Sequence, residues 1–492
     1  MPREEAATSL VGAEILNLIT TGMYHTPLAI YREYIQNAAD AIEASPWPDK
    51  GQVEITINTG KRNVRIRDNG PGLTHAQAER NLIPIARSRK RRGVDRGFRG
   101  IGRLAGLAFA DRITFRTRAR GMQPVTEIAW DGTNLRASAV GCTDPEQIIR
   151  SCVAVSSKDG TGWPNHFFEV EVEHVARHAA GRILNRDAVR RYIAEVGPVP
   201  ISEQFPFKAQ IEALFANEQQ PLTLAVTIDG EQEPIQRRHG PGLKFSEDRE
   251  AVFVELQSLR IPASDSDKDA AIGWVAHSSY IGAIPRELGV RGLRLREGNI
   301  QIGGENVLDP LFSEERFNRW SVGELHIIDE RILPNARRDY FEPSPHMRQV
   351  ENQLESIIQE IVSRCRTASS VRNRTRKVQS TLEHIQCAYD LAGSGYLKAA
   401  DARGLIEKLL QNVQTVEETL DPSDPDYENK VAELGRLRDK LAQFRPRRGR
   451  PPMGKVHSAE IATYQRVFRA LTDLCPSPKV AKEMIEGVIE YT

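Results

Sequence analysis

Hydrophobic and polar positions along the first third of the chain alternate between helical and extended patterns. Residues 28–44 lie between a glycine- and proline-containing turn and a Ser-Pro-Trp-Pro breaker, which predicts a helix. Two alternating runs, 53–57 and 64–67, flank a Thr-Gly-Lys turn and predict a β-hairpin with one buried face. Further strands are expected at 112–116, 125–130 and 166–173. The long glycine- and arginine-rich stretch between these strand groups, 73–102, is typical of a functional loop.

The pattern changes twice further along the chain. From about 205 to 341, strand-like runs alternate with glycine and proline turns and predict a second α/β domain. After Pro343, apolar residues recur at helical spacing and predict long amphipathic helices, interrupted by an Arg/Pro-rich linker. The predicted divisions of the chain are therefore 1–175, 176–345, 346–444, 445–455 and 456–492.

Composition narrows the function without naming it. The formal net charge is +1, so any nucleic-acid surface must be a local patch. The five cysteines are scattered without a CxxC motif, which argues against a zinc site or a disulfide framework and fits a reducing cytosol. The acidic start of the chain predicts no signal peptide, and no apolar run approaches the roughly 20 residues of a membrane span. A cytoplasmic protein without membrane contact is expected.

The first candidate for chemistry is a polar stripe on the predicted helix at 28–44. Glu33, Asn37 and Asp40 are spaced i, i+4 and i+7, which places them on one side of the helix among apolar residues. A carboxylate there can polarise a water, and an amide oxygen is a suitable ligand for Mg²⁺. A surface helix with a salt-bridging glutamate is the alternative.

Two glycine-containing segments follow. Asp68-Asn69-Gly70-Pro71-Gly72 comes directly after a strand; a buried carboxylate there can accept a hydrogen bond from an exocyclic amine, and a plain turn is the alternative. Residues 97–102, Gly-Phe-Arg-Gly-Ile-Gly, lead into an apolar, helix-like segment at 104–111 and can present backbone N–H groups to phosphate. They form neither a Walker loop nor a Rossmann fingerprint.

In this order and spacing, the three segments resemble the N box, the DxGxG box and the GxxGxG box of the GHKL (Bergerat-fold) ATPases. A fourth segment, Asp-Gly-Thr-Gly at 159–162, resembles the late Gly-Thr element of that family. The resemblance covers about residues 10–173 and implies ATP and Mg²⁺ as cofactors. It also implies an α/β protein with an N-terminal Bergerat-type α/β sandwich, a second α/β transducer domain and an α-helical C-terminal region.

The resemblance implies a role for each matching residue. Glu33 would be the general base, Asn37 the Mg²⁺ ligand and Asp68 the residue that reads adenine. Asp40 and Thr161 would support the adenine end. The basic run 87–92, which contains Ser88 and Lys90, would be the ATP lid. The remaining residues expected to contact the nucleotide are Gly70, Gly72, Gly97, Gly100, Ile101 and Gly102.

Within this class, residues 97–111 are closest to the ninety-kilodalton heat-shock chaperones, and the MORC proteins are a near second. Residues 333–339, Leu-Pro-Asn-Ala-Arg-Arg-Asp, resemble the chaperone loop that sends an arginine to the γ-phosphate. The matching residue is Arg338, with Arg337 as the alternative because the loop is one residue shorter here. Arginine suits the role because it stays charged and offers a planar fork to phosphate oxygens. An arginine in an exposed polar turn is the remaining alternative.

Two basic clusters lie in the C-terminal third. Residues 448–451, Arg-Gly-Arg-Pro, match the AT-hook core, in which arginines enter a narrow A·T minor groove; a stiff solvated linker is the alternative. The other cluster lies on or beside a helix, where a solvated face is the alternative. The residues proposed to contact DNA or RNA are Arg372, Arg374, Arg376, Arg448 and Arg450.

The predicted function is an ATP-hydrolysing clamp. ATP orders the lid, the N-terminal domains associate across a homodimer, and Arg338 completes the site. The predicted target is nucleic acid, as in MORC- or MutL-like ATPases of genome defence or repair. The alternatives are a chaperone-like protein-remodelling ATPase and an ATP-binding switch without efficient turnover, and a partner protein also stays open.

Overall fold

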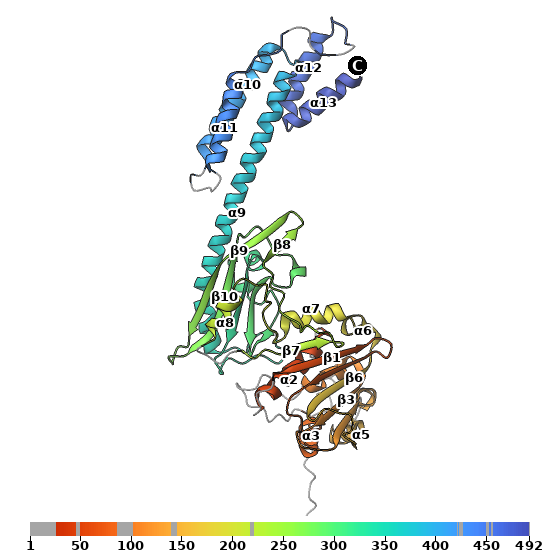
Figure 1. The fold of residues 1–492 in the computed structure, drawn as a ribbon. Helices are drawn as coiled ribbons and strands as arrows, with labels where there is room; N and C mark the ends of the chain where they lie inside the picture. Colours follow the sequence, from red (N-terminus) through yellow and green to blue (C-terminus); the bar gives the residue numbers. More distant parts are fainter. Residues whose placement is uncertain are drawn as a thin grey trace, which may run out of the picture. The chain divides into compact units, whose positions relative to one another are not determined.

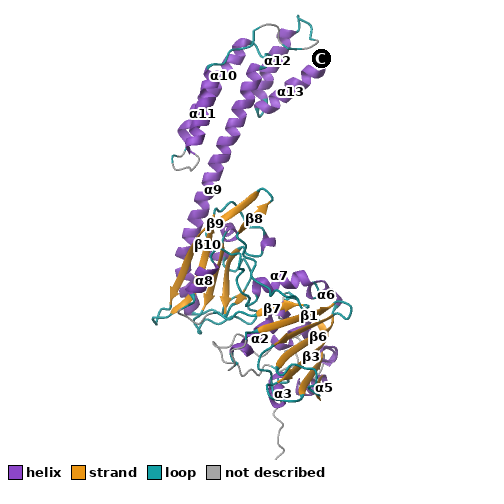
Figure 2. Cartoon of the chain, in the orientation of Figure 1, coloured by secondary structure: helices purple, strands orange, loops and turns teal. Residues whose placement is uncertain are grey.

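The computed structural model describes residues 26–45, 50–85, 102–138, 145–216, 221–420, 422, 427–448, 452–453 and 456–491. The chain forms two compact units, Met1–Cys365 and Arg366–Thr492. Both β-sheets belong to the first unit, and the second unit is helical (Figures 1 and 2). This is the predicted fold class, mixed α/β with two sheet-containing regions and a helical C-terminal region, and the prediction is confirmed.

The first sheet has seven strands in the order β5-β4-β3-β6-β2-β1-β7. Neighbours are antiparallel except β1 and β7, which are parallel. Strands β1 and β2 form the predicted hairpin, with buried and less buried residues alternating along each strand. The strands are β1 (Gln52–Asn58), β2 (Asn63–Asp68), β3 (Ala110–Arg118), β4 (Val125–Asp131), β5 (Val153–Lys158), β6 (Phe167–Val175) and β7 (Ala225–Ile228).

Helices cover this sheet and share one hydrophobic core with it. Ile30 and Ile35 of the predicted N-terminal helix pack in the same buried cluster as Ile55 of β1 and Val172 of β6. This core continues to Ile235, well past the predicted boundary at 175, and the domain boundaries stay a prediction. The helices are α2 (Ala29–Glu43), α3 (His75–Leu82), α4 (Gly132–Ser138), α5 (Pro145–Cys152), α6 (Arg177–Ile183) and α7 (Arg186–Val196).

The helix-like segment expected at 104–111 divides into two elements. A 3₁₀ helix, η2 (Gly102–Ala108), is followed directly by β3, which begins at Ala110. The backbone N–H of Gly106 donates to the Tyr34 hydroxyl of α2 at 3.0 Å. Gly106 is held by this contact with α2, and the residues from Ala110 onward pair with β4 and β6. The helical part of the segment is therefore shorter than expected, because tertiary contacts override the helical pattern.

The second sheet has six strands in the order β12-β11-β13-β10-β9-β8. Strand β10 is buried along almost its whole length, and Trp274 at its centre packs in a cluster with Ile211 of the short helix α8 (Lys208–Leu214). The strands are β8 (Gly242–Ser246), β9 (Arg249–Pro262), β10 (Asp269–Ser278), β11 (Gly292–Glu297), β12 (Ile300–Ile302) and β13 (Val322–Ile327). Short 3₁₀ helices connect them at η3 (Arg286–Leu288), η4 (Asp309–Leu311) and η5 (Glu315–Trp320).

A buried cluster of charges joins the second sheet to the C-terminal end of helix α7. Glu324 of β13 is 2% exposed and pairs with Arg237 and with Arg296, whose Nε lies 2.8 Å from Oε1. Arg296 also donates to the carbonyl oxygens of Glu195 and Gly197, at 2.9 and 3.4 Å, at the C-terminal end of α7. Burial alone would raise the pKa of Glu324, but the two guanidinium groups hold it well below its usual value.

Helix α9 (Pro345–Gly393) runs from the first unit into the second. In the first unit it lies along β9, where Arg364 pairs with Glu255 at 2.7 Å and Glu360 accepts a hydrogen bond from Gln257 at 2.9 Å. In the second unit its last part packs in one hydrophobic cluster with the other helices. These helices are α10 (Ala399–Thr419), α11 (Tyr427–Ala442), α12 (Ile461–Leu474) and α13 (Pro478–Tyr491).

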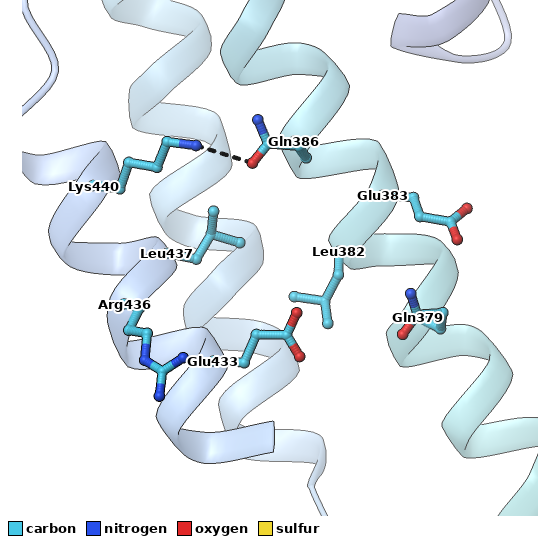
Figure 3. A pocket seen from close by; sticks show the side chains of 8 residues that line it. All are labelled: Gln379, Leu382, Glu383, Gln386, Glu433, Arg436, Leu437 and Lys440. Atoms are coloured by element: carbon cyan, nitrogen blue, oxygen red, sulfur yellow. Dashed lines mark hydrogen bonds between the residues drawn. The ribbon is translucent and has the colours of Figure 1, made fainter. Parts of the chain in front are cut away.

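A shallow groove of about 320 Å³ lies between α9 and α11 in the second unit (Figure 3). Leu382 and Leu437 face each other across it, and Lys440 closes one end by donating to Gln386 Oε1 at 3.1 Å. Its polar lining consists of two glutamates, two glutamines, one arginine and one lysine. In the described part of the chain, no helix is both long and apolar enough to span a membrane.

Candidate functional site

Helix α2 places Glu33 against the start of η2. A methyl group added at Gly102 would stand 2.1 Å from Glu33 Oε2, so only glycine leaves room for the carboxylate in its present position. Arg32 Nη2 donates to the other oxygen, Oε1, at 3.2 Å, and both side chains are 13% exposed. The structure thus brings the predicted base next to the last glycine of the GxxGxG segment, with its carboxylate oriented by the preceding arginine.

The other two residues of the stripe follow along α2. Asn37 is partly buried and lies about one helical turn beyond Glu33, and Asp40 is buried nearly one turn further. Both engage in polar interactions within the protein. Their apolar neighbours Ile35, Ala38 and Ala39 face the core, so the helix turns one polar stripe toward η2 and the loop after β2.

Asp68 is the last residue of β2, and its carboxylate is buried (6% exposed). Oδ1 accepts a hydrogen bond from the backbone N–H of Gly70 at 2.9 Å. Burial raises the pKa of the Asp68 carboxyl from 3.8 to about 7, although the Gly70 hydrogen bond lowers it. No arginine or lysine pairs with it among the ion pairs of the described residues, so the carboxylate is available to accept a hydrogen bond from a ligand.

The glycines after Asp68 permit close contact with neighbouring backbone. Gly72 has φ of +67°, and a side chain there would stand 2.0 Å from the carbonyl oxygen of Arg118. A side chain at Gly70 would press on Asp68 Oδ1 at 2.7 Å and reach Ala41 of α2 at 3.6 Å. The Asp68 turn therefore lies over the C-terminal half of α2.

Helix α2 consequently separates two chemically different ends of one site. Glu33 and Gly102 lie at one end, and Asp68 with Gly70 lies near Ala41 at the other. Eight residues of α-helix advance about 12 Å, which sets the spacing between the two ends. This arrangement suits an elongated ligand with an amine-bearing ring at one end and anionic groups at the other.

The remaining predicted site residues are distributed unevenly. Thr161 is exposed in the turn between β5 and β6, where its hydroxyl hydrogen-bonds the Asp159 carboxylate and holds the pKa of Asp159 low. No contact between Thr161 and Asp68 appears among the described interactions, and its role at the adenine end stays a prediction. Ser88, Lys90, Gly97, Gly100 and Ile101 lie outside the described residues.

The two candidate arginines of the 333–339 loop have different surroundings. Arg338 is buried, and its Nη2 donates to Glu297 Oε2 of β11 at 3.2 Å, within the second sheet. Arg337 is exposed, and its carbonyl oxygen accepts a hydrogen bond at 3.3 Å from the same Arg32 Nη2 that contacts Glu33. The Arg337 backbone and the predicted base, Glu33, thus both contact the Arg32 side chain.

Three residues that the sequence patterns did not single out contribute to the site. Arg32 orients Glu33, His166 contacts the Gly70 carbonyl, and Arg118 packs against Gly72. An arginine before a glutamate and a histidine before a strand carry no distinctive spacing. The contacts of His166 and Arg118 depend on pairing between strands far apart in the chain, and no local signal identifies them.

The side chains present fit an adenine nucleotide with Mg²⁺. The carboxylate of Asp68 is buried and forms no ion pair within the described part of the chain, which suits an exocyclic amine. Asn37 provides an amide oxygen on the same helix as Glu33, and oxygen ligands are what Mg²⁺ prefers. The side-chain-free position at Gly102 leaves room beside Glu33 that any larger residue would fill.

Comparisons with known proteins agree with this geometry. Residues 26–161 match the family described as histidine kinase-, DNA gyrase B-, and HSP90-like ATPase. The chaperone protein HtpG of Fusobacterium nucleatum subsp. nucleatum is 28% identical over 196 residues, which cover 34% of this chain and 31% of the relative. HtpG of Polaromonas sp. is 30% identical over 141 residues, which cover 24% and 22%.

A third HtpG, from Methylibium petroleiphilum, is 27% identical over 196 residues, covering 35% of this chain and 30% of the relative. The chain therefore spans less than a third of the length of these curated relatives. The family match includes the segments that carry Glu33, Asn37 and Asp68. Residues 26–161 form a GHKL-type ATPase domain that is distantly related to that of the HtpG (Hsp90) chaperones.

Proposed function

We propose that this protein binds ATP with Mg²⁺ and hydrolyses it to ADP and phosphate at the site along α2. The observation that carries the proposal is the placement of two different carboxylates on one helix-lined site. Asp68 is buried and has no cationic partner among the described residues, whereas Glu33 is 13% exposed, contacts Arg32 and lies beside Gly102. Bound Mg·ATP would supply the phosphoryl group that water attacks.

Each residue has a separate task in this proposal. Asp68 accepts a hydrogen bond from the adenine amine, and Asn37 offers its amide oxygen to Mg²⁺. Glu33 orients a water molecule and takes its proton at the carboxylate, a role that typically contributes about 10²–10⁴-fold. Arg32 donates to Oε1, which leaves Oε2, the oxygen beside Gly102, to accept that proton. Asp40 and Thr161 remain the proposed supports of the adenine end.

The arginine contribution is assigned to the 333–339 loop. Of its two candidates, Arg337 is the one whose backbone contacts Arg32, while the Arg338 side chain is engaged by Glu297. An arginine side chain from position 337 would place a permanently charged fork near developing phosphate charge. Arg338, the first choice from the sequence, would need to exchange Glu297 for phosphate.

The target of the ATPase is a separate part of the proposal. The HtpG relatives are chaperone proteins, which supports protein remodelling as the output we propose first. Closure of the clamp as a homodimer is part of this proposal. One observation favours nucleic acid as a second candidate: residues 366–380 of α9 contain no acidic residue, and Arg374, Arg376 and Lys377 are exposed there. Arg448 is also exposed, whereas Arg450 lies outside the described residues.

The test is steady-state ATP hydrolysis together with nucleotide binding by wild type, Glu33→Ala and Glu43→Ala. Glu43 is a matched control because it is an exposed glutamate on the same helix. We expect Glu33→Ala to lose at least about 10²-fold in kcat with ATP affinity retained, and Glu43→Ala to match wild type. Equal turnover in Glu33→Ala and wild type would remove Glu33 from its role.

The same assay separates the outputs. Stimulation of turnover by an unfolded protein, with no effect of double-stranded DNA, supports protein remodelling. Stimulation by DNA that falls steeply with salt supports the nucleic-acid candidate, because phosphate contacts release counterions. Tight ATP binding with no turnover under either condition would leave an ATP-binding switch.

A further inference from the structure

The turn from Asp68 to Gly72 is held from both neighbouring strands. On the β1 side, Asn69 accepts from the Gln52 N–H at 2.8 Å and donates to the Lys50 carbonyl at 2.9 Å. On the β6 side, a ring nitrogen of His166, Nδ1, lies 2.8 Å from the carbonyl oxygen of Gly70. Since a carbonyl only accepts, Nδ1 must carry the proton in this contact.

One buried arginine donates hydrogen bonds to several carbonyl oxygens of the loop that carries His166. Arg118, at the end of β3, is 8% exposed. Its Nη1 donates to the carbonyl oxygens of Gly160 and Pro164 at 3.0 and 3.3 Å, and its Nε donates to that of Met122 at 2.7 Å. A guanidinium can donate to carbonyls that lie well apart because its five N–H donors are spread over three nitrogens in one plane, whereas the three donors of an ammonium share one nitrogen.

Arg118 also touches the turn directly through its backbone. Its carbonyl oxygen occupies the position that a side chain at Gly72 would need, 2.0 Å from the ideal Cβ. Next to it, Thr117 Oγ1 accepts from the Leu73 N–H at 2.8 Å and donates to the Phe167 carbonyl at 3.0 Å. The end of β3 therefore contacts the turn at Gly72 and Leu73, and the Arg118 side chain controls the loop that reaches Gly70.

We propose that Arg118, acting through the 160–166 loop and His166, is a positioning residue that sets the Asp68 carboxylate for adenine recognition. This inference rests on the proposed ATP site. Arg118 does not touch the nucleotide in this assignment. It fixes the backbone on which Asp68 and Gly70 lie, and a carboxylate that reads one amine depends on that backbone for its direction.

The test compares Arg118→Lys and His166→Leu with the control Arg112→Lys by KM and kcat for ATP and for GTP. Arg112 is on the same strand, half exposed and 3.6 Å from Glu173. We expect about a tenfold rise in KM for ATP in Arg118→Lys and a smaller, several-fold rise in His166→Leu, with kcat within about twofold of wild type. The preference for ATP over GTP should fall in both variants and stay unchanged in Arg112→Lys.

A merely structural role for Arg118 would give a different result. Loss of folded protein lowers the apparent kcat and the midpoint of thermal unfolding but leaves KM and base preference unchanged, which would overturn the inference. Wild-type KM and base preference in both variants would also overturn it while leaving the ATP site intact. Failure of wild type itself to bind ATP would overturn the proposed function and this inference together.

Discussion

Asp68 of the first sheet and Glu324 of the second are both buried carboxylates, yet burial has opposite outcomes for them. Asp68 accepts one backbone hydrogen bond, and its pKa rises to about 7 because burial penalises its charge. Glu324 lies between Arg237 and Arg296, and these cations hold its pKa well below the usual value despite equal burial.

The difference separates a binding position from a structural one. A buried carboxylate without a cation can still accept hydrogen bonds, and a ligand that donates one stabilises its buried charge. A buried carboxylate between two arginines is already satisfied and ties its neighbours together, here β11, β13 and the C-terminal end of α7. Burial alone does not distinguish the carboxylate that could bind a ligand from the one in a structural ion pair.

The largest expected effect comes from removing the satisfied carboxylate. Glu324→Ala leaves Arg237 and Arg296 buried without compensation and should lower the free energy of unfolding by about 3–5 kcal/mol. Denaturant unfolding measures this, with Glu255→Ala as the control, because Glu255 pairs with Arg364 at the surface. A Glu324→Ala variant as stable as wild type would show that the cluster has no structural weight.

Replacing the Asp68 carboxylate should raise the free energy of unfolding in the absence of nucleotide, the opposite of the effect of Glu324→Ala. Because the folded pKa of Asp68 is raised above 3.8, the contribution of Asp68 to the free energy of unfolding is fully present below that value and is lost as pH rises through about 7. Asp68→Asn should therefore be more stable than wild type at pH 8, on the order of 2–4 kcal/mol, and the gain should shrink by pH 5.

Asp68→Asn should lose ATP affinity over the same pH range, since an amide presents the adenine amine with a weaker acceptor and a competing donor. Isothermal titration with ATP and pH-dependent unfolding measure the two effects separately. An Asp68→Asn variant that binds ATP as wild type does, or that is less stable than wild type at pH 8, would show that Asp68 is not a binding position of the kind contrasted here with Glu324.

A smaller effect should appear when the room beside Glu33 is filled. Gly102→Ala places a methyl group 2.1 Å from the present position of Glu33 Oε2, which must move. The displaced atom ends a flexible side chain, so we expect little change in unfolding but at least a tenfold loss in kcat, since misplacement by about 1 Å can cost 10²-fold. Gly181→Ala, where the added group meets open space, is the control.

The smallest expected effect distinguishes the two arginines of the 333–339 loop. Arg337→Ala should reduce kcat several-fold without changing the unfolding midpoint, because Arg337 is exposed and its backbone contact with Arg32 does not need its side chain. Arg338→Ala should lower stability by about 1 kcal/mol through loss of its contact with Glu297. The reverse pattern in parallel kinetic and thermal measurements would restore Arg338 as the catalytic arginine.

Local patterns predicted much of the fold and the parts of the site that lie close together in the chain. The helix with Glu33 and Asn37 and the β1–β2 hairpin were readable because each repeats its burial pattern over several residues. The helix predicted at 104–111 is wrong in its last residues. The apolar composition of the segment suits a helix, but Ala110 and Asp111 belong to strand β3. Strand β7 lies in a run with a strand-like pattern, but its pairing with β1 of the first sheet had no local signal.

The amino-acid sequence was sufficient to locate the motifs of the candidate nucleotide site, because their order and spacing along the chain resemble those of the GHKL ATPases. It could not assign Arg118 and His166, which reach the Asp68 turn through the pairing of β2, β3 and β6. It also could not separate Arg337 from Arg338 or recognise Glu324 as a structural ion pair. Those assignments depend on which side chains the fold brings within a few ångströms, and contact across the chain leaves no periodic trace in the sequence.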